Sequence, residues 1–147
     1  MGAVFDLFVA LTLVAALASG SHALQKLSLL LLFAWAFTNL AVDGLGFARA
    51  PLITPSVDAA TAVLVAWVGY TTRSFAALVV FILYTFVGEA HLFFIIRRME
   101  ATYTYYSTLN ILFLMQLLVI GVPGAWIAVR LRTVGGGERL RPHPARR

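Results

Sequence analysis

The sequence predicts an all-α integral membrane protein, a bundle of five transmembrane helices that is followed by a basic tail. Of its 147 residues, 61% are hydrophobic and only 12% are charged, whereas a soluble domain has about 45–50% apolar and about 25% charged residues. The apolar residues form runs longer than a buried core helix requires, which indicates lipid as the solvent of the outer surface. The chain contains no cysteine, which excludes disulfides, thiolate metal sites and cysteine nucleophiles.

The first two predicted spans cover residues 3–19 and 27–47. The first is apolar and ends in small residues, as a secretory signal peptide does, but its first charge is the acidic Asp6 rather than a basic residue. We therefore interpret it as a retained helix. A short polar break separates it from the second span, which opens with a nearly unbroken leucine run. Pro51 and Pro55 are expected to end the second span, because proline lacks the amide that a helix interior needs.

The third predicted span starts near Ser56, a residue type that caps helix N-termini, and ends near Tyr70. Asp58 falls in its first turn, where a carboxylate suits the helix dipole. A tight turn at residues 71–73 leads into the fourth span, residues 74–96. The third span has about 17 residues, the lower limit for crossing a bilayer, so a chain with four spans is the alternative.

The fifth predicted span covers residues 108–129 and is expected to bend at 121–124, where a proline lies between two glycines. Tyrosines precede it, at the headgroup level that amphipathic aromatic residues prefer. The residues after this span are rich in Gly, Pro and Arg, a composition typical of disorder. The sequence therefore divides into a helical bundle, residues 1–132, and a basic, disordered cytoplasmic tail, residues 133–147.

The basic residues predict the orientation of the chain. Six of the eleven lie in the last eighteen positions, which suits a cytoplasmic tail that faces anionic lipid headgroups rather than nucleic acid. With five spans, eight basic residues lie inside and three outside, as the positive-inside rule requires. Four spans also leave three outside, so charge predicts the side of the C-terminus but not the number of spans. We prefer five, because four would expose the apolar run 59–68. The expected location is the cytoplasmic membrane, with the N-terminus outside.

This arrangement gathers acidic side chains toward the outer face of the membrane. The candidate polar cluster comprises Glu89, Asp43, Asp58, His91 and Asp6. Ionisable residues inside a span are costly and usually face the bundle interior or a wet cavity, so the cluster is a candidate site for a cation, a metal ion or a proton. The favoured alternative is that carboxylates near helix ends pair with nearby arginines or reach water.

Only one residue of the fourth span is expected at the centre of this cluster. Glu89 and His91 are two positions apart, so their side chains point about 200° apart on a helix and cannot both face the bundle interior. We expect Glu89 to face it, because a carboxylate has the stronger reason to avoid lipid.

The remaining polar residues indicate packing rather than chemistry. Asn39, Asn110 and Gln116 are interpreted as hydrogen-bonding side chains between helices. His22 and His91 do not form a haem pair in this topology, because they lie near opposite surfaces. No spacing assembles a nucleophile, and the glycine run in the tail has no strand and helix around it to cradle a phosphate. The sequence therefore predicts no enzyme and no cofactor.

A resemblance covers most of the chain. It rests on the following residues, in this order across the short spans: Asn39, Asp58-Ala59-Ala60, Arg73-Ser74, His91, Asn110 and Gln116. In this order the chain resembles small polytopic membrane proteins of unknown function from phage and prophage gene clusters. The resemblance implies a phage-associated setting, with membrane permeabilisation during lysis as one role. It carries no catalytic residue over to this chain.

Three functional hypotheses follow. The first, which we favour at this point, is a non-enzymatic accessory or self-associating subunit in a homo-oligomer or a larger membrane complex. The second is a holin-like permeabilising protein. The third is a proton or cation channel or transporter that uses the outer acidic cluster.

Overall fold

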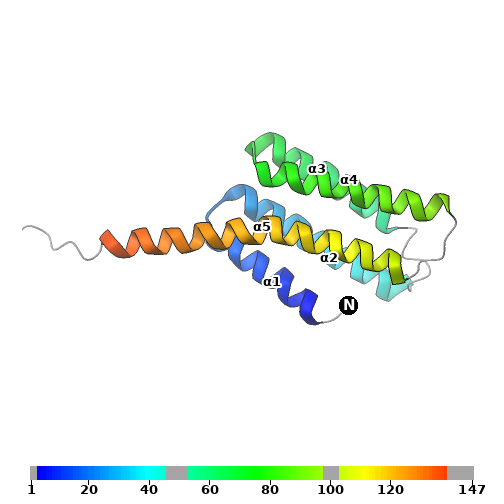
Figure 1. The fold of residues 1–147 in the computed structure, drawn as a ribbon, viewed down its shortest axis with the longest axis horizontal. Helices are drawn as coiled ribbons and strands as arrows, with labels where there is room; N and C mark the ends of the chain where they lie inside the picture. Colours follow the sequence, from blue (N-terminus) through cyan, green and yellow to red (C-terminus); the bar gives the residue numbers. More distant parts are fainter. Residues whose placement is uncertain (1–2, 46–52, 98–102, 139–147) are drawn as a thin grey trace, which may run out of the picture.

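The computed structural model describes residues 3–45, 53–97 and 103–138, and these residues form five α-helices and no strand (Figure 1). The helices are α1 (Ala3–Ala18), α2 (His22–Leu45), α3 (Thr54–Thr72), α4 (Phe75–Ile96) and α5 (Tyr103–Glu138). The predicted all-α class is therefore confirmed. Pro51, which was expected to end the second span, and the last nine residues of the predicted tail lie outside the described residues.

The hairpin between α3 and α4 is formed by local capping. Arg73 ends α3 in the left-handed region, with a φ of 50°. The hydroxyl oxygen of Ser74 then accepts a hydrogen bond from the backbone amide of Ala77 at 3.4 Å and caps α4. Side-chain oxygens of serine commonly satisfy one of the free amides at a helix start. The bounds of the fourth helix are thus confirmed to within one residue, whereas α3 continues to Thr72 and the turn is confined to Arg73 and Ser74.

Three helix starts differ from the prediction. α5 begins at Tyr103 instead of residue 108. α2 begins at His22 instead of Leu27, so residues 22–26 of the polar break are part of the helix and only Ser21 precedes it. The side-chain amide of Gln25 donates a hydrogen bond to the carbonyl of Leu17, in α1, at 3.3 Å.

α3 begins at Thr54, and Pro55 lies in its first turn. A proline costs no hydrogen bond there, because the first amides of a helix have no partner in the helix. Pro55 therefore starts the third helix and does not end the second.

α5 is longer than predicted and is continuous through Pro123. It extends to Glu138, beyond the expected end at residue 129, and projects past the other helices (Figure 1). Helical structure thus covers the first residues of the segment predicted to be a disordered tail. The two glycines beside the proline face α1: a methyl group at Gly124 would lie 3.0 Å from the Ala15 carbonyl, and one at Gly121 would lie 3.2 Å from the Thr12 hydroxyl oxygen. These glycines permit close packing of two helices.

α2 contacts each of the other four helices. Around it, α1 packs against α5, α3 against α4, and α4 against α5 (Figure 1). The core where they meet is aliphatic, with fully buried side chains from all five helices, among them Ala16, Leu27, Val65, Val80 and Ile120. Each of the leucine, valine and isoleucine side chains contributes about 1.5–3 kcal/mol when removed from water, although lipid provides much the same apolar surroundings.

Some of the described helices have the length and composition of membrane-spanning segments. Three are long and apolar enough to cross a bilayer, over His22–Gly44, Phe75–Ile96 and Thr104–Thr133. The apolar helix Phe5–Ala18 is shorter. Large apolar side chains also face outward around the bundle: Phe33 is 70% exposed and Trp67 is 64% exposed. A soluble monomer rarely exposes apolar surface this widely, so lipid is the natural solvent for it.

Candidate functional site

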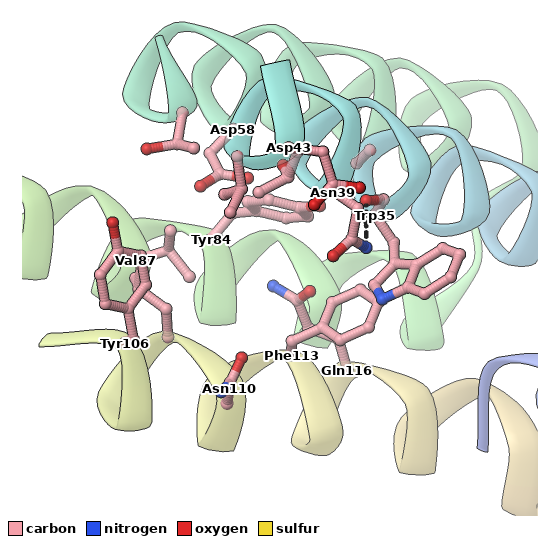
Figure 2. Close-up of a pocket in the computed structure, with 15 residues that line it drawn as sticks. Trp35, Asn39, Asp43, Asp58, Tyr84, Val87, Tyr106, Asn110, Phe113 and Gln116 are labelled. Atoms are coloured by element: carbon pink, nitrogen blue, oxygen red, sulfur yellow. Dashed lines mark hydrogen bonds between the residues drawn. The ribbon is translucent and has the colours of Figure 1, made fainter. Parts of the chain in front are cut away.

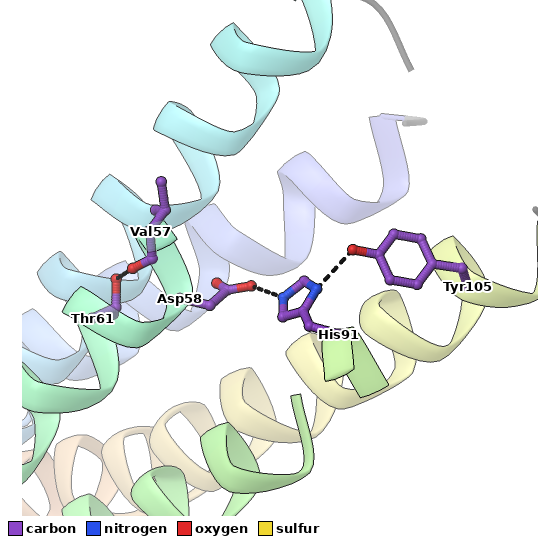
Figure 3. Close-up of polar contacts among 5 residues, drawn as sticks. All are labelled: Val57, Asp58, Thr61, His91 and Tyr105. Carbon is purple, nitrogen blue, oxygen red and sulfur yellow. Dashed lines mark hydrogen bonds and ion pairs between the residues drawn. The ribbon is translucent and has the colours of Figure 1, made fainter. Parts of the chain in front are cut away.

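Three helices meet at a histidine that has two polar partners (Figure 3). The Nε2 atom of His91, in α4, lies 2.8 Å from a carboxylate oxygen of Asp58 in α3. Its Nδ1 atom lies 2.7 Å from the hydroxyl oxygen of Tyr105 in α5. The histidine is only 3% exposed. We call these three residues the polar node.

The donors and acceptors of the polar node are mutually consistent. A carboxylate can only accept, so Nε2 of His91 carries a hydrogen and donates it to Asp58. In the neutral imidazole, Nδ1 then accepts a hydrogen bond from the Tyr105 hydroxyl. Both ring nitrogens therefore have a partner, as a buried histidine requires.

The topology explains why these three residues meet. α3 and α4 form an antiparallel hairpin, so the start of α3 and the end of α4 lie at the same end of the bundle. α5 begins at this end as well and packs against α4. The ring of Tyr105 is further held by edge-on contacts with Phe94 and Tyr106, at centroid distances of 4.6 and 5.1 Å.

A cavity of about 130 Å³ lies beside the polar node, between α2, α3, α4 and α5 (Figure 2). Ten of its fifteen lining residues have a polar group in the side chain: Trp35, Thr38, Asn39, Asp43, Thr54, Asp58, Tyr84, Tyr106, Asn110 and Gln116. The others are Ala34, Val42, Val87, Leu109 and Phe113. Asp58 belongs to both the polar node and the cavity wall.

Two buried nitrogen donors of the cavity wall, and the buried hydroxyl of Thr54, have no hydrogen-bond partner among the described residues. The indole Nε1 of Trp35 and the amide Nε2 of Gln116 are buried and make no hydrogen bond within the described residues. Gln116 is only 1% exposed, and Figure 2 shows its side chain and that of Trp35 reaching into the same space from α5 and α2. A buried donor without a partner lowers the stability of the fold by about 1–3 kcal/mol. A hydrogen-bond acceptor inside the cavity would therefore stabilise both nitrogen atoms.

The described wall of the cavity has acidic side chains but no basic ones. Asp43 and Asp58 line it, and none of the described residues in its wall is lysine or arginine. Arg97, at the end of α4, points elsewhere and stacks over the Phe93 ring at 5.6 Å. The surroundings therefore favour a positively charged occupant.

The structure brings part of the predicted acidic cluster together. Asp58 and His91 are in direct contact, and Asp43 lines the adjoining cavity. Asp6 lies exposed on α1, away from the cavity. As expected, one of the two residues of the fourth helix faces inward, but it is His91: Glu89 is exposed. The expectation that Glu89 faces the bundle interior is therefore wrong, because His91 finds two partners there.

The three residues with a side-chain amide that were predicted to pack between helices lie in the cavity wall, which the sequence analysis did not predict. Asn39, Asn110 and Gln116 all line the cavity. The Asn39 amide donates to the backbone carbonyl of Trp35 at 2.9 Å, within its own helix and not to a neighbouring helix as predicted. The Nε2 atom of Gln116 has no partner among the described residues. Sequence reasoning also missed Tyr105 and Trp35. The tyrosines were interpreted only as interfacial anchors, since nothing in their spacing predicts a histidine partner.

Within the described part of the chain, no group of three or more histidine, aspartate or glutamate side chains is placed to hold a metal ion. Comparison with protein-family models, with curated proteins and with solved structures gives no match. The resemblance to phage-associated membrane proteins, the holin-like role and the accessory-subunit role therefore stay predictions of the sequence.

Proposed function

We propose that the chain is a non-enzymatic multi-pass membrane protein that takes up a cation into the cavity between α2, α3, α4 and α5, in the class of cation channels and transporters. The observation that carries the proposal is a cavity with two carboxylates, no basic residue in its described wall and unpaired buried polar atoms. His91 and Tyr105 are not in the wall, so we assign them the positioning of Asp58 rather than chemistry on a substrate.

The physical reason is the cost of a charge in a surrounding of low dielectric constant. Asp58 has a side chain that is only 21% exposed, and an isolated carboxylate loses several kcal/mol of hydration on such burial. The hydrogen bond from His91 compensates part of this loss and uses one acceptor position of the carboxylate, which has about four. A cation in the cavity binds to the remaining positions and neutralises the charge.

The proposal includes five membrane spans, with the cavity open toward the outer side. α3 runs antiparallel along α4 and, at 19 residues, is about 28 Å long, so it reaches the same depth in the bilayer. Its outward face is apolar, with Trp67 and Tyr70 64% and 81% exposed. At the other end of the bundle, Arg130 stacks over Trp126 at 5.0 Å, a pair that suits the cytoplasmic interface of the cytoplasmic membrane.

Single-cysteine labelling tests the third span directly, because the chain has no cysteine of its own. Cysteines are placed before and after α3, as Ile53→Cys and Thr71→Cys, both at exposed positions. With an impermeant maleimide we expect Ile53→Cys to react from outside and Thr71→Cys to react only after the membrane is opened. If both cysteines reacted equally from one side, α3 would not cross the membrane and the five-span bundle would be contradicted.

Cation uptake is tested by thermal unfolding of the purified protein in chloride salts of equal ionic strength. The cations are sodium, potassium, ammonium, tetramethylammonium and choline, with N-methylglucamine as a reference too large for the cavity. At a concentration about a hundred times the dissociation constant, a ligand stabilises the folded state by about 2.7 kcal/mol. For a chain of this size, that raises the unfolding temperature by roughly 5–10 °C.

We expect at least one of these cations to give such a shift, and Asp58→Asn to remove it. The asparagine keeps an acceptor for His91 but removes the charge. Asp6→Asn, at an exposed acidic position outside the cavity, is the matched control and should keep the shift. Equal unfolding temperatures in all six salts, or a full shift in Asp58→Asn, would refute cation uptake at this site.

A further inference from the structure

The cavity wall holds a second kind of cation-binding group besides its carboxylates. Four aromatic side chains line it: Trp35, Tyr84, Tyr106 and Phe113. Figure 2 shows them around the space that Asp58 also faces. Aromatic faces attract cations through the ring quadrupole, and combinations of aromatic rings with a carboxylate are typical of sites for organic ammonium groups. A small inorganic cation would instead prefer several oxygen ligands close together.

The cavity has the size of a small organic molecule. Its volume is about 130 Å³, and a protein cavity of about 150 Å³ takes up benzene. An occupant that fills it therefore has on the order of six to eight non-hydrogen atoms, which is more than a bare metal ion and fewer than a whole lipid or a peptide.

The unpaired donors indicate what the ligand carries besides its charge. The buried Trp35 Nε1 and Gln116 Nε2 both need an acceptor, and neither can hydrogen-bond to an ammonium group, which has no lone pair. Figure 2 shows Asp58 and Trp35 toward opposite ends of the cavity. A ligand that satisfies both ends has a positive charge at one end and a neutral oxygen at the other.

We infer that the cation taken up by this cavity is a small organic ammonium ion that bears a hydroxyl or ether oxygen. Its charged group lies against Asp58, Asp43 and the aromatic rings, and its oxygen accepts hydrogen bonds from Trp35 and Gln116. This inference rests on the proposed function and names its ligand class. Choline and ethanolamine are the simplest ions of this kind.

Trp35 provides a direct reporter of binding. The chain has three tryptophans, and the other two, Trp67 and Trp126, are exposed outside the cavity. In the variant Trp67→Phe/Trp126→Phe, the fluorescence therefore comes from the cavity wall alone. We expect choline to change this fluorescence in a saturable manner, and the dissociation constant is read from the titration.

Two isosteric analogues of choline separate the features of the ligand. In 3,3-dimethylbutan-1-ol a carbon replaces the charged nitrogen, and in propyltrimethylammonium a methyl group replaces the hydroxyl. We expect the neutral alcohol to bind at least about tenfold more weakly than choline, since it loses the carboxylate and ring attraction. Propyltrimethylammonium should bind about three- to tenfold more weakly, since two buried donors stay unpaired.

Gln116→Leu tests the hydroxyl contact separately. The leucine removes the donor at nearly the same volume, so this variant should discriminate less between choline and propyltrimethylammonium than the parent does. The control is Glu89→Gln, at an exposed position outside the cavity, which should keep the full discrimination. If the two ammonium ions bind equally to the parent, or sodium or potassium binds as tightly as choline, the inferred ligand class is wrong while cation uptake stands. If no cation changes the fluorescence or the unfolding temperature, the proposed function itself fails.

The same ammonium chemistry occurs on free choline and on lipid headgroups. Titrations in bilayer discs of pure phosphatidylglycerol and of phosphatidylglycerol mixed with phosphatidylcholine separate these sources. Because the cavity volume matches one small organic ion, we expect free choline to fill it and the choline dissociation constant to be the same in both. Weaker apparent binding of free choline in the mixed discs would show competition by the headgroup and overturn the assignment to a free ligand.

Discussion

Gly124→Leu is expected to separate α1 from α5 and to cause the largest loss of stability of any single change considered for this chain. Even a methyl group at this position would lie 3.0 Å from the carbonyl carbon and oxygen of Ala15 and 3.1 Å from the amide nitrogen of Ala16. These are backbone atoms, which cannot rotate away as a flexible side chain can. The two helices must therefore move apart, and the contacts along their shared length are lost.

The expected magnitude follows from measured effects of overpacking. Gly124→Ala should lower the free energy of unfolding by about 1–3 kcal/mol, and Gly124→Leu by more. The measurement is unfolding of the reconstituted protein with sodium dodecyl sulfate, followed by circular dichroism. The loss of close packing between the helices makes the main contribution to this destabilisation. Burial of apolar side chains contributes little, because lipid surrounds them with apolar groups as well.

Gly88→Ala is the matched control, because it replaces a glycine in the interior of another helix. A methyl group at Gly88 would meet nothing within 4 Å. The alanine also improves helix propensity by up to about 1 kcal/mol, so this variant should be unchanged or slightly more stable. If Gly124→Ala were as stable as Gly88→Ala, α1 would not approach α5 as closely as described.

His91→Leu is expected to lower the free energy of unfolding by about 2–3 kcal/mol, because it removes the common partner of Asp58 and Tyr105. Each buried polar group left unpaired costs about 1–3 kcal/mol. A single hydrogen bond between membrane helices contributes about 0.6 kcal/mol on average. A loss of unfolding free energy well above this value would show that both contacts of His91 stabilise the fold. The same unfolding assay measures it.

The control for His91→Leu lies two positions away on the same helix. Glu89→Gln changes the ionisable residue that the sequence placed at the centre of the acidic cluster, but Glu89 is exposed. Its effect should stay within about 0.5 kcal/mol. His91→Gln is a milder variant that keeps one hydrogen bond. We expect its loss of unfolding free energy to lie between the losses for Glu89→Gln and His91→Leu. If Glu89→Gln lowered the free energy of unfolding more than His91→Leu did, the described orientation of α4 would be contradicted.

Local features of the sequence predicted much of the architecture. The long apolar runs indicated helices, and the described residues form five helices and no strand. The bounds of α1 and α4 and the turn at Arg73 followed from local composition and from the capping serine, because such features act within one helical turn. The starts of α2, α3 and α5 were predicted too late along the chain. For α2 and α3 the reason is that polar residues and a proline occupy the first turn, where a helix tolerates them.

The candidate site was predicted only in part. Asp58, His91 and Asp43 belonged to the predicted cluster and lie at the cavity or in the polar node. Trp35 and Tyr105 were not predicted, because their partners come from other helices and no spacing along the chain encodes such a contact. Gln116 was recognised as a polar residue of a span, but its unpaired amide is visible only when the neighbouring helices are in place.

The sequence by itself determined that this chain is helical, where α1 and α4 begin and end, and that polar groups gather toward one end of the bundle. Only the tertiary structure decided which face of each helix is inside, and so placed His91 in the core and Glu89 on the surface. The physical reason is that these helices are apolar on all sides. A soluble helix shows its buried face as a stripe against a polar background, but a helix that faces lipid carries similar residues on both faces, so its inner side is set by its partners.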